Sequence, residues 1–99
     1  MMKNIHNELT EKFFDIILNL ETPEECRHFF EDICTIKEIQ DMSQRLEVAF
    51  LLNSGKSYQE VLSETGVSTA TISRVNKCLN YGSGGYKAAI QKYSEKKGN

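Results

Sequence analysis

SYQEVLSETGVSTATISRVNKCL, residues 57–79, is the stretch that decides the fold of this 99-residue chain. Ser57 and Glu60 have the spacing of a capping box, which predicts a short helix over residues 58–64. Gly66 follows at the point where the chain needs a positive φ in order to reverse its direction. A second helix begins directly after this turn, and a helix, a tight glycine turn and a helix are typical of a helix-turn-helix.

The second predicted helix spans residues 69–79, and Ser68 is placed to cap it. At 100° per residue its inner side holds Thr71, Ile72, Val75, Cys78 and Leu79. Its outer side holds Thr69, Ala70, Ser73, Arg74 and Lys77. The outer side chains are short, polar or cationic, and the helix contains no carboxylate. A helix that enters a major groove needs small side chains for close approach and donors for base edges and phosphates.

We therefore predict that the chain binds double-stranded DNA with this helix. The expected DNA-contacting residues are Lys56, Ser68, Thr69, Ala70, Thr71, Ser73, Arg74 and Lys77. The charge pattern agrees, because residues 1–54 carry 5 Lys/Arg and 11 Asp/Glu, whereas residues 55–99 carry 7 and 3. The two parts have net charges of −6 and +4, which indicates an acidic scaffold and a basic working end. Helix pairs of this kind also serve as protein-interaction modules without DNA binding, and that alternative stays open.

Before the helix pair, residues 1–55 are predicted to form a scaffold of three amphipathic helices, over about 7–20, 23–33 and 36–54. The expected buried stripes of the first two are Leu9, Phe13, Ile16, Ile17 and Leu20, and Cys26, Phe29, Phe30 and Ile33. Thr22-Pro23-Glu24-Glu25 and Thr35-Ile36-Lys37-Glu38 both fit capping boxes. This half has more apolar surface than a lone small chain easily buries, which favours a helical dimer over a compact monomer core.

On the other side of the helix pair, residues 80–86 break the helical pattern with three glycines in four residues. This loop is interpreted as a hinge, with backbone contacts to phosphate as the alternative. A last helix is predicted over residues 86–97, and its lysines make it basic.

Several classes of protein are disfavoured by the composition, which is 39% hydrophobic and 26% charged. Cys26, Cys34 and Cys78 are an odd count without a Cys-x-x-Cys pair, so we expect neither a disulfide framework nor a metal site. The start of the chain, residues 1–6, lacks the apolar core of a signal peptide. The apolar run over residues 48–52 is too short to span a membrane, so a cytoplasmic location is expected. No catalytic constellation is visible, and we expect a binding protein without a cofactor rather than an enzyme.

The order of these elements resembles the Trp repressor superfamily. The similarity extends over residues 33–79 and is strongest in Ala70-Thr71-Ile72-Ser73-Arg74. The tail Leu79-Asn80-Tyr81-Gly82-Ser83-Gly84-Gly85-Tyr86 is similar to the YerC/YecD type of that superfamily. The resemblance implies an all-α, Trp-repressor-like helical array that forms a single domain over residues 1–99. It also implies an intertwined homodimer whose reading helices address successive major grooves, about 34 Å apart.

The resemblance further implies a ligand site, because Arg45, Arg74 and Thr35 match residues that hold tryptophan in that family. Cys78 stands where the family has a ligand-contacting serine, and Val75 stands where it has a glycine beside the indole. We therefore expect the ligand to be a molecule other than tryptophan, or to be absent. The leading prediction is a sequence-specific DNA-binding repressor. A repressor that senses an amino acid or another small anionic metabolite through Thr35, Arg45, Arg74 and Cys78 is the alternative.

Overall fold

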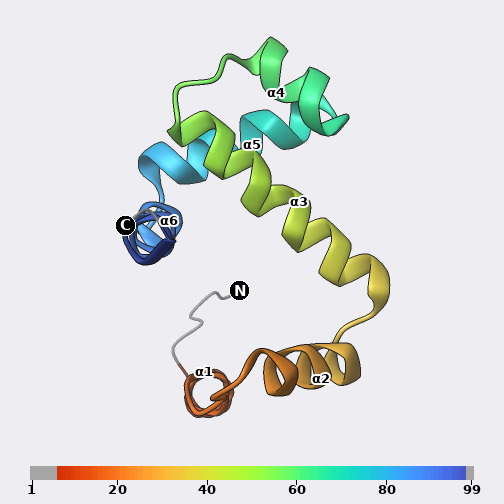
Figure 1. Cartoon of the computed structure of the whole chain (residues 1–99), viewed down its shortest axis with the longest axis vertical. Helices are drawn as coiled ribbons and strands as arrows, with labels where there is room; N and C mark the ends of the chain where they lie inside the picture. Colours follow the sequence, from red (N-terminus) through yellow and green to blue (C-terminus); the bar gives the residue numbers. More distant parts are fainter. Residues whose placement is uncertain (1–6, 98–99) are drawn as a thin grey trace. The chain divides into compact units, whose positions relative to one another are not determined.

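The computed structural model describes residues 7–97, and its regular elements in this range are six α-helices (Figure 1). They are α1 (Glu8–Leu18), α2 (Pro23–Ile33), α3 (Ile36–Asn53), α4 (Tyr58–Thr65), α5 (Thr69–Tyr81) and α6 (Gly85–Lys97). The prediction of an all-helical chain is confirmed. Residues 1–6, on which the expectation about a signal peptide rests, lie outside the described residues.

The chain divides into two compact units, Met1–Ile39 and Gln40–Asn99. The first unit contains α1 and α2, and the second contains most of α3 together with α4, α5 and α6. The single domain expected over residues 1–99 stays a prediction.

In the N-terminal unit, α1 and α2 begin where their caps require. The side chain of Thr22 accepts a hydrogen bond from the amide of Glu25 at 3.1 Å, and Pro23 occupies the first helical position. The predicted capping box is wrong in one detail, because the Glu25 carboxylate accepts from the amide of Glu21 at 2.9 Å. That amide lies one residue before the cap, within the reach of the flexible glutamate side chain. The box at Thr35 and Glu38 is confirmed by bonds of 2.8 and 3.0 Å.

The apolar stripes of α1 and α2 are not buried within the single chain, and the dimer interface predicted for this half of the sequence stays a prediction. Neither helix contains a buried residue, and Leu9, Leu18 and Ile33 are 79%, 80% and 51% exposed. Phe13 and Phe29 are half-buried, with ring centroids 6.3 Å apart. Two helices of eleven residues supply too little surface to cover each other's apolar faces.

The core lies in the C-terminal unit and draws on all four of its helices (Figure 1). Its buried members are Val48 and Ala49 of α3, Val61 of α4, Val67 of the turn, Ile72, Val75 and Leu79 of α5, and Ile90 of α6. Phe50, Leu51 and Leu52 of α3 pack against this core from further directions. The last turn of α3 is therefore covered on more than one side, as its apolar sequence indicates.

Two glycines set the limits of α4 and α5. Gly66 adopts the left-handed conformation, with φ 73° and ψ 6°, and its amide donates to the carbonyl of Leu62 at 2.8 Å. The predicted positive φ is confirmed. The helix α5 runs to Tyr81, two residues beyond the expected end, and then stops at Gly82. A Cβ atom at Gly82 would collide with the carbonyl oxygen of Cys78, so this stop requires glycine.

The backbone conformation at Gly66 leads to a stability prediction. Replacing Gly66 with alanine should lower the free energy of unfolding by about 1–2 kcal/mol, because an L residue is strained at positive φ. The added methyl group would have no neighbouring atom within 4 Å, so the loss of stability would come from the backbone conformation alone. Gly85→Ala is the matched control, since its added Cβ atom meets only the Ser83 hydroxyl at 3.8 Å. Urea denaturation at one fixed protein concentration measures both, and equal midpoints would contradict this account.

Candidate nucleic-acid interface

The helix α4 begins with the predicted capping box. The hydroxyl oxygen of Ser57 accepts from the amide of Glu60 at 3.1 Å, and the Glu60 carboxylate accepts from the amide of Ser57 at 2.8 Å. The hydrogen bond that the Ser57 amide donates stabilises the ionised carboxylate, and together with a smaller contribution from the Ser57 side chain it lowers the pKa of Glu60 below its ordinary value. The start of α4 is therefore held by two reciprocal bonds.

The helix α5 begins with a second hydroxyl cap. Ser68 accepts from the amide of Thr71 at 3.1 Å, and its own hydroxyl donates to the Thr71 hydroxyl oxygen at 3.0 Å. Both hydroxyls are thus engaged in starting the helix, and their predicted DNA contacts stay predictions. The first turn of α5 contains no acidic residue, so the positive end of the helix dipole is not offset there.

One face of α5 is exposed and free of carboxylates. This reading face consists of Thr69, Ala70, Ser73, Arg74 and Lys77, all exposed. The opposite side carries Ile72 and Val75, which are 0% and 2% exposed, so packing fixes the direction in which the reading face points. Cys78 is exposed although it was predicted on the inner side. Its angular position lies at the border of that side, beyond the cover of the neighbouring helices.

The cations near this face differ in their partners. Arg74 and Lys77 form no ion pair within residues 7–97. By contrast, Lys56, which precedes α4, places its Nζ 3.0 Å from Oε2 of Glu64. The hydrogen bond and the charge of Glu64 raise the pKa of Lys56 above its ordinary value. Of these three predicted DNA-contacting cations, one is paired with a carboxylate, and the other two have no ion-pair partner in the described part of the chain.

A hollow of about 320 Å³ lies beside the reading face. It is called the arginine hollow here and is lined by Asp41, Gln44 and Arg45 of α3, Val67 and Ser68 of the turn, and Thr71 and Arg74 of α5. Two arginines and one aspartate are among the residues that line it, so both signs of charge occur in its wall.

The structure brings together only part of the predicted ligand set. Arg45 and Arg74 line the arginine hollow, whereas Cys78 does not, and Thr35 caps α3 in the N-terminal unit. Val75 lies in the core rather than on the wall of the hollow. Asp41 and Gln44 are members that sequence reasoning missed, and their signal was the spacing i, i+3, i+4 with Arg45 on one helix face.

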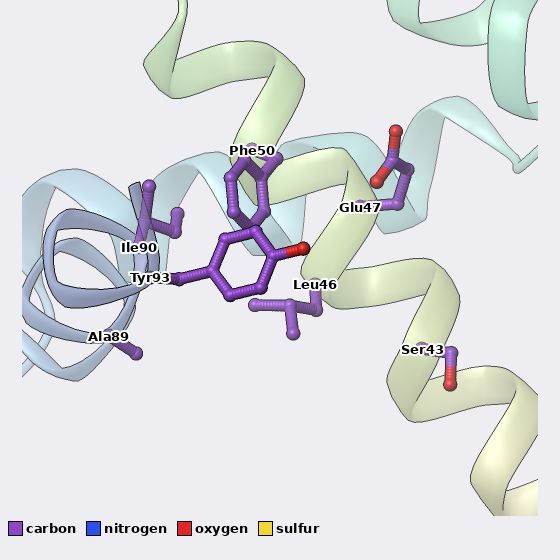
Figure 2. A pocket seen from close by; sticks show the side chains of 7 residues that line it. All are labelled: Ser43, Leu46, Glu47, Phe50, Ala89, Ile90 and Tyr93. Atoms are coloured by element: carbon purple, nitrogen blue, oxygen red, sulfur yellow. The ribbon is translucent and has the colours of Figure 1, made fainter. Parts of the chain in front are cut away.

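A second, apolar groove lies between α3 and α6, with a volume of about 570 Å³. Figure 2 shows Tyr93 of α6 reaching toward Phe50 and Leu46 of α3. The rings of Phe50 and Tyr93 meet edge to face, with centroids 5.6 Å apart. Leu46 and Tyr93 remain 42% and 54% exposed, so this groove is an uncovered apolar surface.

The described residues form neither a metal-binding cluster nor a membrane-spanning helix. Within residues 7–97, no three His, Cys, Asp or Glu side chains are grouped so as to hold a metal ion. None of the helices in that range is long and apolar enough to cross a membrane.

Comparison with known proteins agrees with this geometry. The Trp repressor protein family matches residues 8–94, and the chain belongs to that family. The family resemblance stated from the sequence is confirmed.

Individual relatives are similar along nearly the whole chain. The uncharacterised protein YerC of Bacillus subtilis (strain 168) is 52% identical over 85 residues, which cover 86% of this chain and 82% of YerC. The crystal structure of a TrpR-like protein from Eubacterium eligens ATCC 27750 matches with a TM-score of 0.87 and 44% identity, covering 91% of this chain and 93% of that one. A solved structure from Staphylococcus aureus gives a TM-score of 0.86 and 42% identity, with coverages of 91% and 90%.

The capping box of α4 can be tested through the pKa of its acidic residue, Glu60. Ser57→Ala removes the hydroxyl cap and should lower the free energy of unfolding by about 1 kcal/mol. In the wild-type protein, the lowered pKa of Glu60 contributes stability above the pKa of the unfolded chain, and this is lost as pH falls through the folded value. NMR titration should therefore show the Glu60 pKa moving toward its ordinary value in Ser57→Ala. An unchanged pKa would show that the hydroxyl has no part in holding this carboxylate.

Proposed function

We propose that this protein is a sequence-specific DNA-binding transcriptional regulator, a repressor, and that α4, the turn at Gly66 and α5 are its helix-turn-helix. The observation that carries the proposal is the reading face of α5, which is exposed, free of carboxylates and equipped with Arg74 and Lys77. Small side chains at Thr69, Ala70 and Ser73 permit close approach to base edges. Membership in the Trp repressor protein family supports this assignment.

We further propose that the protein acts as an intertwined homodimer. Support comes from the N-terminal unit, where neither helix buries a residue and where Leu9, Leu18 and Ile33 are left exposed. The apolar groove at Leu46 and Tyr93 adds a second uncovered surface in the other unit. Apolar surface on this scale is characteristic of an interface. In a symmetric dimer, each copy of the chain would bury these faces against its partner.

The DNA proposal is tested by selection from random duplex DNA followed by binding measurements over a range of salt concentrations. We expect an enriched palindrome, because two copies would read two half-sites. The Arg74→Ala, Lys77→Ala double variant should bind more weakly, and the slope of log affinity against log salt should become shallower by about 1–2. The reason is that each lost phosphate contact releases about one fewer counterion.

The Lys12→Ala, Arg27→Ala double variant is the matched control, since it also removes two exposed cations, from α1 and α2, and leaves the reading face intact. Its affinity and salt slope should equal those of the wild type. If the wild-type protein enriches no sequence and its weak binding is flat with salt, DNA binding is refuted. The helix pair would then serve as a protein-interaction module.

The arginine hollow favours a second candidate function, the sensing of a small ligand. Arg45 and Arg74 come from different helices, and Asp41 supplies a carboxylate on the same wall. Arg74 belongs both to this hollow and to the reading face, so a bound anion would act directly on a DNA-contacting group. An amino acid or another small anionic metabolite other than tryptophan is the proposed ligand class.

Thermal unfolding with a panel of amino acids and carboxylic acids tests this second function. A ligand at a hundred times its Kd should add about 2.7 kcal/mol to the free energy of unfolding. The gain should vanish in Arg45→Ala, whose side chain lines the hollow but lies outside the reading face. No stabilisation at millimolar concentration by any member of the panel would count against sensing.

A further inference from the structure

Lys56 is a predicted DNA-contacting cation that lies outside the reading face, and it forms an ion pair with Glu64. The backbone of Lys56 is anchored, because its amide donates to the carbonyl of Leu51 at 3.0 Å. Its side chain reaches Glu64 of α4, where Nζ and Oε2 are 3.0 Å apart. The two side chains are 40% and 46% exposed, so the pair lies at the surface and can open.

We infer that Glu64 is an affinity-determining residue that occupies Lys56 in place of a DNA phosphate. The inference rests on the proposed function. A carboxylate and a phosphate offer the same kind of anionic oxygen to an ammonium group, so Lys56 can engage one of them fully at a time. DNA binding then exchanges a carboxylate within the protein for a phosphate of the duplex.

The place of Lys56 in the fold supports this exchange. It directly precedes Ser57, the cap of α4, and the first helix of a helix-turn-helix crosses the DNA backbone. Arg74 and Lys77, which form no ion pair within the described part of the chain, need no such exchange. Glu64 therefore lowers the contribution of Lys56 to DNA affinity and leaves the contributions of Arg74 and Lys77 unaffected.

The size of the effect follows from the exposure of the pair. Half-exposed ion pairs are weak, and breaking one before binding should reduce DNA affinity by about two- to fivefold. The pair is itself strengthened at low salt, so competition is greatest there. Removing Glu64 should therefore also steepen the salt dependence of binding, by up to about 0.9 in slope.

A double-mutant cycle in the full-length protein tests the inference on the selected duplex. Glu64→Gln keeps the shape of the side chain and removes its charge, and should bind about two- to fivefold more tightly than the wild type. In a Lys56→Ala background, the same Glu64→Gln change should have no effect, because the competition needs both partners. Glu31→Gln is the matched control, with the same change in net charge at an exposed position of α2.

The outcomes separate this inference from its alternatives. A gain that persists in the Lys56→Ala background means that Glu64 repels DNA through its charge alone, and overturns the inference. Equal affinities of wild type and Glu64→Gln overturn it as well. If the wild type and the Arg74→Ala, Lys77→Ala variant bind DNA equally weakly, with flat salt dependence, the proposed function fails first and the inference fails with it.

Discussion

The packing of α5 against α3 and α4 is the constraint on which the rest of the C-terminal unit depends. Ile72 and Val75 are almost completely buried and meet Val48 of α3 and Val61 of α4 in one core. Close-packed side chains resist rotation of the helix, because any turn about its axis would open voids. The exposed side of α5 is therefore held in one direction. The direction of the reading face is thus set by the inner face, whose buried side chains are all apolar.

The net charge of the chain is distributed unevenly along the sequence. The acidic N-terminal part and the basic C-terminal part differ by ten units of net charge, although the whole chain is close to neutral. Carboxylates that occur near the helix pair are engaged locally, Glu60 in the capping box and Glu64 with Lys56. Such local engagement limits their repulsion of a polyanion while they help to shape α4. If the proposed DNA binding holds, these two carboxylates also influence the electrostatics of the DNA-facing surface.

Much of this arrangement could be predicted from short-range signals. The capping boxes at Thr35 and Ser57 and the glycine at position 66 were each recognisable, because a cap or a positive φ depends on neighbours only a few residues away. Burial was harder to predict. The stripes of α1 and α2 have the periodicity of core residues, yet they are exposed in the single chain, because periodicity shows that a face is apolar and not what covers it.

By itself, then, the sequence determined the helical elements to within a few residues, the hydroxyl caps at Thr22, Thr35, Ser57 and Ser68, the turn at Gly66 and the family. It also determined which side chains share the outer side of α5, since the helical period settles that geometry. Only the tertiary structure decided that Arg45 and Arg74 line one hollow with Asp41, that Cys78 is exposed, and that Lys56 is paired with Glu64. The physical reason is the distance along the chain over which each kind of interaction acts. Caps and periodicity depend on contacts within one or two turns, whereas these features depend on how separate segments pack and on where long side chains find partners.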